Sequence, residues 1–374
     1  MRPVFCAFLL VAMFSTLLAV DPVRQPILAA GGYHSMFLDT NGVLWVWGCN
    51  ASGQLGDGTT IERDVPFKAK LPPEMPRITA LAGGEDFTLA LTALGTVWAC
   101  GLNDAGQLGN GTTNNSCVFI PVRNLTKIVS IAAGQKHALA IAQMGEAWSW
   151  GANGHGQLGN NDKPNGLLPS SIPGITNAIG IAAGGAHSLV LTREDIVWSF
   201  GKNESGQLGN GITQDSSHPT LIPNLMNIQM VAAGQDHSLA LKEDGTVWSW
   251  GGNIYGQLGH DATQDTQRPA MVSNLKGIRW IGAGYDHSVA MDEQNIVSTW
   301  GDNNLGQLGR KVSGFDTMPT PVNQAINLTV IRCGGYHTLF VDSSDRTLGS
   351  GNDYFGQLGD WSHKDRFRPV PTYK

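Results

Sequence analysis

Along most of the chain, short segments of apolar residues, or of alternating apolar and polar residues, are separated by glycine-rich turns. One copy of this pattern has an apolar segment at 228–233, an alternating one at 237–241 and an aromatic-rich one at 247–250. Alternation with a period of two is typical of a half-buried strand, and Asp244-Gly245 favours a tight hairpin between the second and third segments. A fourth segment contains a proline, which suits an outer edge strand. The pattern therefore predicts four strands in an antiparallel meander.

This four-segment unit is repeated, and the tetrapeptide Gly-Gln-Leu-Gly marks each copy. Successive copies are 53 residues apart once and then 50 residues apart five times. A repeat of this length indicates supersecondary units that stack or close into a ring, and four-stranded units arranged radially form a β-propeller. The sequence predicts an all-β fold, a seven-bladed β-propeller of four-stranded antiparallel blades. The tetrapeptides lie at Gly53–Gly56, Gly106–Gly109, Gly156–Gly159, Gly206–Gly209, Gly256–Gly259, Gly306–Gly309 and Gly356–Gly359.

Residue sizes within one unit fit the wedge shape of a propeller blade. The first segment, where blades converge on the axis, carries small residues such as Ala132 and Ala133, and the third carries large ones such as Trp248 and Trp250. In each tetrapeptide we expect the leucine to fill an apolar gap and the glutamine amide to bond neighbouring backbone groups. We expect residues 21–374 to form a single propeller of seven repeats, whose last blade contacts its first.

The first twenty residues differ in character from the repeats. Arg2 is the only charged residue before Asp21, and the stretch from Val4 to Val20 is almost wholly apolar. A positive charge, an apolar run and a small residue near Ala19 predict a secretory signal peptide over residues 1–20, and hence a secreted, lumenal or periplasmic protein. The alternative is an uncleaved membrane anchor, because the run is at the short limit for crossing a bilayer.

Charge and cysteine content narrow the range of partners. The net charge is −6 and only 14% of residues are charged, which argues against a surface that binds nucleic acid or acidic lipid. Four cysteines follow the first segment, none with the Cys-x-x-Cys spacing of zinc sites. Separate thiols are favoured over disulfides, although three pairings stay open. These cysteines are Cys49, Cys100, Cys117 and Cys333.

Two polar positions recur in nearly every unit and are therefore expected to serve the blade itself. An asparagine follows the aromatic segment, where we expect an Asx-type turn that opens the loop. A histidine begins the second segment, and its recurrence on separate blades favours a structural hydrogen bond over metal ligation. The asparagines are Asn50, Asn103, Asn153, Asn203, Asn253 and Asn303, with Asp353 in the last unit. The histidines are His34, His137, His187, His237, His287 and His337, with Asp86 expected in the equivalent place of the second unit.

The residues between Ala-Gly and the histidine differ from unit to unit, so the fold does not dictate them. Strand direction places these turns and the Gly-Gln-Leu-Gly loops on one face, and the hairpins on the other. Aromatic and charged residues near a channel mouth are candidates for binding a partner, although they are equally compatible with ordinary turns. The candidates are Tyr33, Glu85, Lys136, Asp236, Tyr285, Asp286 and Tyr336. For an exported eukaryotic protein, Asn110 and Asn114 would be the better candidates for glycosylation.

The phrases Ala-Gly-x-x-His-Ser, Val-Trp-Ser-Trp-Gly-x-Asn and Gly-Gln-Leu-Gly together resemble those of the regulator-of-chromosome-condensation propeller family. The resemblance covers the chain after its first segment and implies a seven-bladed propeller. The founding type of that family is a guanine-nucleotide exchange factor for a small nuclear GTPase and also docks on nucleosomes. Others are plant ultraviolet photoreceptors, parts of ubiquitin ligases or secreted inhibitors of β-lactamase, so the fold does not fix the function.

Outside the repeats we find no activated nucleophile, acid–base pair or open metal site, so the sequence predicts no enzyme, catalytic residue, metal or cofactor. The varying turns hold no tryptophan or arginine, which excludes a photoreceptor of the plant type. The even spacing leaves no room, after the first unit, for the inserted wedge of the founding exchange factors. The sequence favours a monomeric, non-catalytic, secreted or lumenal module that binds a protein. The alternative is an exchange-factor-like regulator of a small GTPase.

Overall fold

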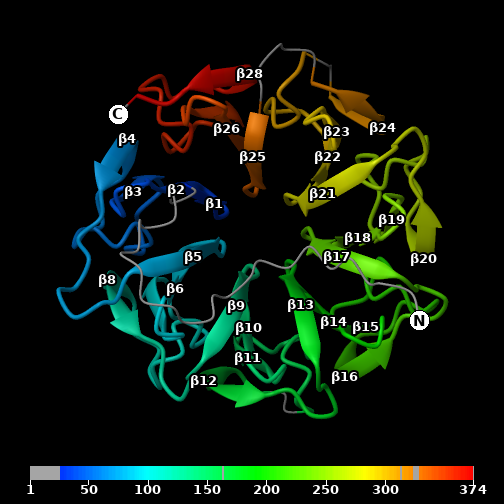
Figure 1. Cartoon of the computed structure of the whole chain (residues 1–374), viewed down its shortest axis with the longest axis horizontal. Helices are drawn as coiled ribbons and strands as arrows, with labels where there is room; N and C mark the ends of the chain where they lie inside the picture. The colour runs from blue at the N-terminus through cyan, green and yellow to red at the C-terminus, as the bar shows by residue number, and fades with distance from the viewer. Residues whose placement is uncertain (1–25, 162–163, 312–313, 323–327, 374) are drawn as a thin grey trace, which may run out of the picture.

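The computed structural model describes residues 26–161, 164–311, 314–322 and 328–373, which form twenty-eight strands and no helix. The strands make seven four-stranded antiparallel sheets, arranged as blades around a central axis (Figure 1). This confirms the predicted fold, a seven-bladed β-propeller. The predicted signal peptide, residues 1–20, lies outside the described residues.

Each blade is built from four consecutive strands, paired in chain order from the axis outwards. Blades 1 to 4 comprise β1 (Ile27–Ala30), β2 (His34–Leu38), β3 (Leu44–Gly48), β4 (Arg63–Lys68), β5 (Ile78–Gly83), β6 (Phe87–Thr92), β7 (Val97–Gly101), β8 (Ser116–Pro121), β9 (Ile128–Ala133), β10 (His137–Ala142), β11 (Ala147–Gly151), β12 (Gly166–Ser171), β13 (Ala178–Ala183), β14 (His187–Thr192), β15 (Val197–Gly201) and β16 (Ser216–Leu221). Blades 5 to 7 comprise β17 (Ile228–Ala233), β18 (His237–Lys242), β19 (Val247–Gly251), β20 (Thr266–Met271), β21 (Ile278–Ala283), β22 (His287–Asp292), β23 (Val297–Asp302), β24 (Phe315–Pro321), β25 (Leu328–Cys333), β26 (His337–Asp342), β27 (Thr347–Gly351) and β28 (Arg366–Pro371).

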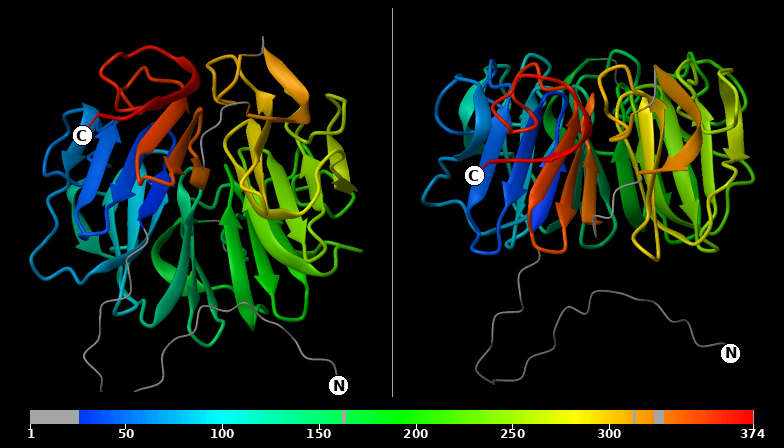
Figure 2. Two further views of the ribbon diagram at one scale, coloured as in Figure 1. Left: turned by 45° about the horizontal axis from the view of Figure 1, so that its top comes forward. Right: turned by 90° about the horizontal axis from the view of Figure 1, so that it is seen from above.

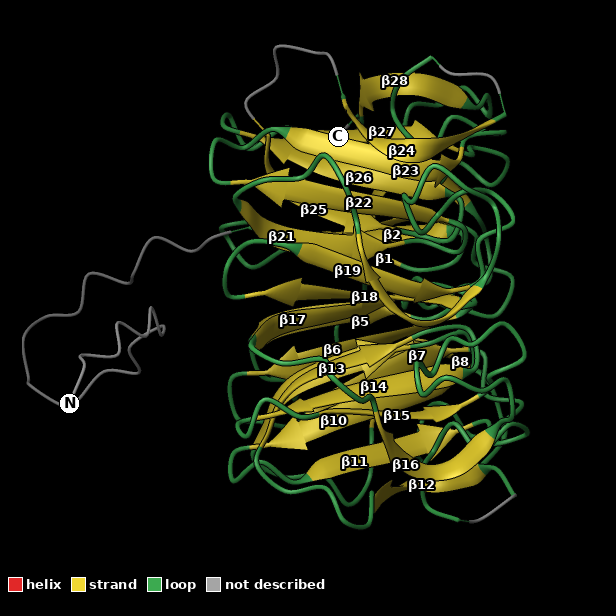
Figure 3. Cartoon of the chain, turned by 90° about the vertical axis from the view of Figure 1, so that its right-hand side faces the viewer, coloured by secondary structure: helices red, strands yellow, loops and turns green. Residues whose placement is uncertain are grey.

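The ring has two distinct faces, seen from the side in Figures 2 and 3. One carries the turns between the first and second strands, such as 234–236, and the Gly-Gln-Leu-Gly loops between the third and fourth. We call this the turn face. The opposite, hairpin face carries the tight turns between the second and third strands, such as 243–246. The meander thus separates the two classes of turn as the sequence predicts.

The hydrophobic core lies between neighbouring blades rather than inside any one blade. One cluster, for example, joins Leu239 and Val247 of blade 5 to Ile281, Ala290 and Trp300 of blade 6. Among the large third-strand side chains, Trp150, Trp250 and Trp300 are fully buried in these junctions, whereas Trp148, Trp198 and Trp248 are half-buried. The first strands contribute small residues near the axis. Burying an aliphatic or aromatic side chain of this kind stabilises the fold by roughly 1.5–3 kcal/mol.

The glutamine of each tetrapeptide joins its blade to the next one by hydrogen bonds, an arrangement that we call the latch. The carbonyl oxygen of Gln207 accepts hydrogen bonds from Ser238 Oγ and Trp250 Nε1 of the following blade, both at 2.9 Å. Its side-chain Oε1 accepts the backbone N–H of Ser205 at 3.0 Å, and the adjacent Leu208 is fully buried. These contacts confirm the expected roles of the glutamine amide and the leucine.

The same kind of hydrogen bond to a glutamine carbonyl joins the last blade to the first. The ring is therefore closed by contact between these two blades, as expected. Ser35 Oγ and Trp47 Nε1 of blade 1 donate to the carbonyl of Gln357 in blade 7, at 2.7 and 2.8 Å. Among the described residues, no strand is exchanged between these two blades, since each sheet consists of four consecutive strands. Closure therefore depends on side-chain packing and the latch, as at every other junction.

The recurring histidines also bridge the junctions, which confirms their structural role. His237 Nε2, for example, lies 3.0 Å from Ser288 Oγ of the next blade. Burial lowers the pKa of these six imidazoles to about 3, so they are neutral at pH 7. A Cβ at Gly234 would stand 2.2 Å from His237 Cε1, which explains the glycine that precedes each histidine by three residues.

One junction departs from this rule, and it corrects the expected alignment of the second unit. Phe87, not Asp86, occupies the histidine position, since Phe87 pairs with Gly101 as His237 pairs with Gly251. The residue facing it in blade 3 is Ala138, where other blades have serine or threonine. Histidine and hydroxyl are thus lost together, because either one left alone would be a buried polar group without its partner.

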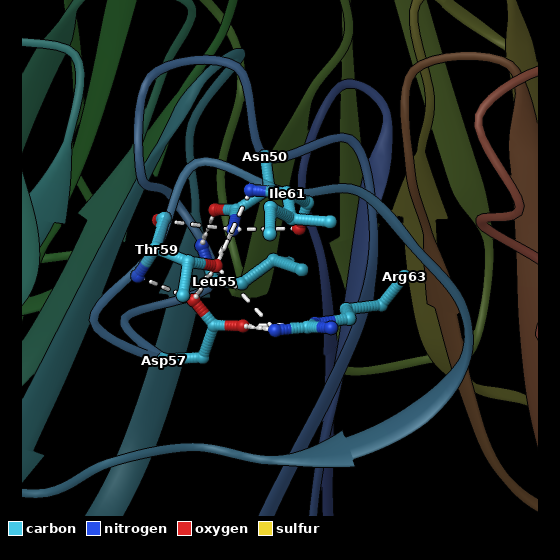
Figure 4. Close-up of polar contacts among 6 residues, drawn as sticks. All are labelled: Asn50, Leu55, Asp57, Thr59, Ile61 and Arg63. Atoms are coloured by element: carbon cyan, nitrogen blue, oxygen red, sulfur yellow. Dashed lines mark hydrogen bonds and ion pairs between the residues drawn. The ribbon is translucent and has the colours of Figure 1, made fainter.

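The recurring asparagine closes the loop rather than opening it with a local turn (Figure 4). Asn50 Oδ1 accepts the backbone N–H of Leu55, five residues on, at 3.0 Å, and its Nδ2 donates to the carbonyls of Thr59 and Ile61. The prediction of an Asx-type turn is therefore wrong in its span, because an Asx turn bonds the backbone two residues on. The bond to the leucine recurs in all seven blades, with Asp353 as acceptor in the last.

Candidate functional site

The seven turns of the turn face meet at the mouth of the central channel. Backbone hydrogen bonds lead from each turn to the next, for example from Gly32 N to Gly84 O at 2.9 Å and from Tyr285 N to Gly335 O at 3.0 Å. Together with those of the other blades, these bonds form a closed ring around a cavity of about 90 Å³ lined mainly by alanine and glycine. The side chains of the turns are thus carried by a fixed backbone.

The two varying residues of each turn have different surroundings. The first of each pair, such as Glu85 or Tyr285, lines the channel mouth. The second contacts the loop of the preceding blade, as where the side-chain amides of Gln207 and Gln257 donate to Asp236 and Asp286 at 2.8 and 3.2 Å. In blade 2 the pair is Glu85 and Asp86, and Asp86 accepts from Gln54 Nε2 at 2.9 Å. The acidic residues of these turns therefore also hold the Gly-Gln-Leu-Gly loops of the preceding blades in position.

Five aromatic rings form a continuous strip across blades 6, 7 and 1. Tyr285 meets Tyr336 edge-on at 5.1 Å between ring centroids, and Tyr336 lies 5.7 Å from Tyr33. Tyr33 contacts Phe355 at 5.5 Å, and Phe355 contacts Tyr354 at 4.8 Å. We call these five residues the aromatic strip. Edge-to-face pairs at these distances contribute about 0.5–1.5 kcal/mol beyond the area they bury.

Glycines in the neighbouring turns give the aromatic strip its shape. A Cβ at Gly335 of blade 7 would stand 2.7 Å from Tyr285 Cε2, and one at Gly32 of blade 1 would stand 2.7 Å from the Tyr285 hydroxyl. Tyr285 of blade 6 therefore lies across the turns of the next two blades, where only glycine leaves room for the ring. The tyrosine in the turn of blade 6 therefore requires glycine in the turns of blades 7 and 1.

Carboxylates flank the aromatic strip. Burial raises the pKa of Asp286 to about 6, and the carboxylates of Asp302 and Asp236 contribute to the same shift. Burial also raises the pKa of Glu85, and neighbouring Asp86 adds to this effect. Within the described residues, neither Asp286, Asp302 nor Glu85 forms an ion pair with lysine or arginine.

The acids further round the face are neutralised. Lys136 Nζ lies 2.6 Å from Asp104, and Lys202 Nζ lies 3.1 Å from Asp236. Lys136 and Asp236, both candidates from the sequence, are thus already paired within the chain. The unpaired negative charge is concentrated beside the aromatic strip.

Among the described residues, the loops of blades 6, 7 and 1 are each closed by an ion pair at a position where the loops of blades 2 to 4 have none. Arg63 binds Asp57 at 2.6 Å in blade 1, and Arg366 binds Asp360 at 2.7 Å in blade 7. In blade 6 the charges exchange places, with Arg310 and Asp316 at 2.7 Å. The equivalent positions in blades 2 to 4 hold asparagine followed by serine or glycine. The loops that support the aromatic strip are therefore the ones closed by ion pairs.

The structure brings all seven sequence-predicted candidates to the turn face, and every one is half-buried. The sequence reasoning missed Asp86, Asp302, Tyr354 and Phe355. The last two precede the seventh Gly-Gln-Leu-Gly, at a position that also varies between units, from Ala-Ser to Tyr-Phe. Comparing the units at this second position as well would have found them.

Other predicted features show no convergence on a site. Among the described residues, no three histidine, cysteine or acidic side chains are grouped to hold a metal, and Cys49, Cys100, Cys117 and Cys333 are free thiols. Asn110 accepts hydrogen bonds from the loop, for example from Thr112 N at 3.0 Å, and Asn114 is exposed. Glycosylation at either residue was expected only for an exported chain and stays a prediction.

Family models match across the propeller. The model for the RCC1-like domain matches residues 168–373, more than half of the chain. The model for the regulator of chromosome condensation (RCC1) repeat matches residues 41–91, 95–141 and 144–191. The chain belongs to the RCC1 repeat family. The resemblance drawn from the three sequence phrases is thereby confirmed.

Known relatives share segments of RCC1 repeats with the chain. It is 40% identical to human protein RCC2 over 95 residues, which is 25% of this chain and 18% of RCC2. It is 44% identical to the RCC2 homologue of Danio rerio over 84 residues, 22% of this chain and 17% of the relative. It is 36% identical to the probable E3 ubiquitin-protein ligase HERC3 of Homo sapiens over 94 residues, 25% of this chain and 9% of HERC3. The matches thus span less than a fifth of each relative.

Solved structures agree with the fold over nearly the whole ring. Human WBSCR16 superposes with a TM-score of 0.78 at 25% identity, covering 89% of this chain and 95% of WBSCR16. Prp20p of Saccharomyces cerevisiae, a protein studied for its binding to Gsp1p and histones, superposes with a TM-score of 0.79 at 23% identity, covering 88% and 85%. At this identity the likeness to Prp20p concerns the fold alone.

These comparisons overturn the predicted location. The prediction of a secreted or lumenal protein, with a membrane anchor as its alternative, is wrong, because the relatives matched at higher identity, RCC2 among them, are intracellular proteins. The prediction depended on Arg2, the apolar run from Val4 to Val20 and a small residue near Ala19, and such a pattern does not distinguish export from other uses of an apolar segment. Within the described residues, no helix is both long and apolar enough to cross a bilayer.

Proposed function

We propose that the chain is a non-catalytic protein-binding propeller that regulates a small GTPase in the manner of a nucleotide exchange factor, with the turn face as its binding surface. The main support is the contrast within that face between a framework repeated in every blade and side chains that differ from blade to blade. Membership of the RCC1 repeat family supports the class of partner. This was the alternative function from the sequence.

The turn face suits recognition because its side chains are preorganised. The ring of backbone bonds fixes the turns, and ion pairs close the loops of blades 1 and 7. A surface that is already ordered loses little conformational entropy when it binds, so more of the contact free energy appears as affinity. Tyrosine supplies large contact area with few rotatable bonds, which is why it is frequent among residues that dominate interfaces.

Exchange activity requires binding rather than covalent chemistry. If the propeller binds a nucleotide-free GTPase more tightly than the nucleotide-bound form, linkage demands that it weaken nucleotide binding by the same factor. Such a protein needs no nucleophile and no metal of its own. Of the candidates from the sequence, the proposed contacts are those in or beside the aromatic strip, Tyr33, Glu85, Tyr285, Asp286 and Tyr336. Lys136 and Asp236 are already paired within the chain and are not among them.

The proposal is tested by nucleotide-controlled capture. The immobilised chain is incubated with small GTPases that EDTA has stripped of Mg²⁺ and nucleotide, and bound protein is then challenged with Mg²⁺ and GTP. We expect one GTPase to be retained in EDTA and released by GTP. Failure to retain any GTPase, or retention that nucleotide does not change, would contradict the proposal.

A matched pair of variants tests the choice of face. Tyr336→Leu removes a ring from the centre of the aromatic strip, and Asp244→Asn changes an exposed hairpin on the opposite face. We expect the first to reduce capture of the GTPase and the second to leave it unchanged, once circular dichroism has shown that both fold. Loss of capture by Asp244→Asn alone would assign binding to the hairpin face.

A further inference from the structure

The aromatic strip combines exposed ring faces with negative charge that the described part of the chain does not neutralise. Tyr354 at its outer end is 72% exposed, and Tyr33, Phe355 and Tyr336 are half-buried. Rings of this kind attract cations to their faces through the ring quadrupole. The strip runs outwards from the channel mouth over blade 7 and offers a ligand several such rings in succession.

The carboxylates beside the strip are held in place by hydrogen bonds from neighbouring groups. Asp302 accepts hydrogen bonds from Asn304 Nδ2 and Gln307 Nε2, at 2.6 and 2.7 Å. Asp286, whose backbone carbonyl accepts the N–H of Asp302 at 2.8 Å, takes one hydrogen bond from Gln257. The donors are neutral amides, so they orient the carboxylates without cancelling their charge.

Tyr336 is the point at which ring and charge meet. Burial raises the pKa of its hydroxyl, and the next causes are the carboxylates of Asp286, Asp302 and Glu85. The same ring contacts Tyr285 and Tyr33. A cation placed beside Tyr336 would therefore lie against aromatic rings and close to three carboxylates at once.

Some acids elsewhere on the turn face are paired with a lysine of the chain, whereas, in the part of the chain that the structure describes, those beside Tyr336 are not. At blades 3 and 5 the chain supplies the cation itself, through Lys136 and Lys202. For Asp286 and Asp302 of blade 6, beside the strip, it supplies none within the described residues, although these carboxylates are half-buried and buried. Half-buried like charges are unfavourable unless a counter-charge is brought to them. The missing cation is then the contribution of a partner.

We propose that the aromatic strip, with Asp286 and Asp302, binds an arginine side chain presented by a protein partner. A guanidinium group is flat, so it stacks on a tyrosine ring while its edge donates two parallel hydrogen bonds to a carboxylate. An ammonium group lacks this geometry. The acidic surroundings repel phosphate, so a nucleic acid does not fit the same site. The inference rests on the proposed protein-binding function and specifies the chemistry of the partner surface.

The test uses small probes, so it does not require the partner to be known. Saturation-transfer NMR at low salt is recorded on the full chain with Nα-acetyl-arginine amide, with the lysine analogue, and with the citrulline analogue, which has the shape of arginine but no charge. We expect saturable binding of the arginine probe with a dissociation constant on the order of 1 mM, weaker binding of lysine and none of citrulline. Equal binding of arginine and citrulline, or no binding of arginine, would overturn the inference.

Variants locate the site. Asp286→Asn keeps the size of the side chain and removes its charge, and Tyr336→Leu removes the ring. Both should weaken arginine binding by about fivefold or more, since each removes one of the two attractions. The matched control is Glu204→Gln, which removes an exposed acid from the same face over blade 4. Equal weakening by all three variants would mean attraction to general surface charge and would overturn the inference.

This experiment is independent of the capture of a GTPase. A chain that binds the arginine probe but retains no GTPase would leave the inference standing and contradict the proposed function. A chain that retains a GTPase but does not bind arginine would contradict the inference only. If Tyr336→Leu does not fold, Asp286→Asn with its control still decides between these outcomes.

Discussion

Blades 6, 7 and 1 and blades 2 to 4 share one framework but differ in what they place on it. In the first group, ion pairs close the loops, aromatic residues occupy the turns and neighbouring acids lack a cation within the described residues. In the second, asparagine stands where the first group has an ion-paired residue, and in blade 3 a turn lysine is paired with an acid of the preceding loop. Repetition thus identifies the framework, and the departures from it are gathered in one sector of one face. The predictions below separate these two contributions.

Acidification should act on the framework of all blades and is expected to have the largest effect. The six junction histidines have folded pKa values of about 3 against an ordinary value of 6.5. Below pH 6.5 the unfolded chain therefore binds protons that the folded chain excludes. Each histidine then removes about 1.4 kcal/mol of stability per pH unit until its folded pKa is reached.

We expect the ring to unfold cooperatively between about pH 6 and pH 4, as followed by far-ultraviolet circular dichroism. The double variant His237→Phe, Ser288→Ala copies the pair found at Phe87 and Ala138 and removes one titrating group. It should unfold at a lower pH than the wild type. A midpoint unchanged by this variant would show that the histidines do not govern acid unfolding.

The second prediction concerns the ion pairs that close the loops of blades 6, 7 and 1, and it distinguishes these blades from blades 2 to 4. Arg63→Met leaves the buried carboxylate of Asp57 without its cation, so we expect a loss of about 2 kcal/mol in the free energy of unfolding by urea. Ser116→Ala, at the equivalent position of blade 2, should cost no more than about 0.5 kcal/mol. Similar losses in both variants would mean that the ion pair does not brace the loop.

Much of this fold could be predicted from the sequence, because the repeat reveals which residues serve the blade. The latch residues Gln207 and Trp250 and the junction residue His237 all lie at positions shared by most units. The exact partners of these residues could not be predicted, since they lie 31 to 51 residues away across a junction. The replacement of histidine and serine by Phe87 and Ala138 was missed for this reason. The two residues belong to neighbouring units, so comparing one position at a time does not show that they change together.

The sequence predicted that the candidate site lies on the turn face, but not that it is restricted to blades 6, 7 and 1. Variation between units pointed to Tyr285 and Tyr336, but not to their contact with each other. Nor could it reveal that Lys136 is neutralised by Asp104, because the two belong to different blades. Export was predicted from one short N-terminal pattern, a positive charge followed by an apolar run and a small residue, and was wrong. Composition is a weaker guide than a position that repeats seven times.

The exceptional junction gives a smaller, local prediction. Phe87→His alone places an imidazole opposite Ala138, where it has no hydroxyl partner, and should destabilise the fold by about 1–3 kcal/mol. Adding Ala138→Ser should recover about 1 kcal/mol of that loss, which a double-mutant cycle by urea unfolding would measure. A coupling energy near zero would show that histidine and hydroxyl do not depend on one another.

The central claim is that blades 6, 7 and 1 bind the partner, and the most direct test changes affinity with little change in stability. The dissociation constant of the captured GTPase is measured by surface plasmon resonance for the wild type, for Tyr336→Leu and for Lys136→Met. Lys136 lies on the same face in an exposed ion pair, and such pairs contribute little to affinity. We predict a loss of about tenfold or more for Tyr336→Leu, as for buried tyrosine anchors, and no more than about threefold for Lys136→Met. Equal losses, or a larger loss for Lys136→Met, would contradict the account.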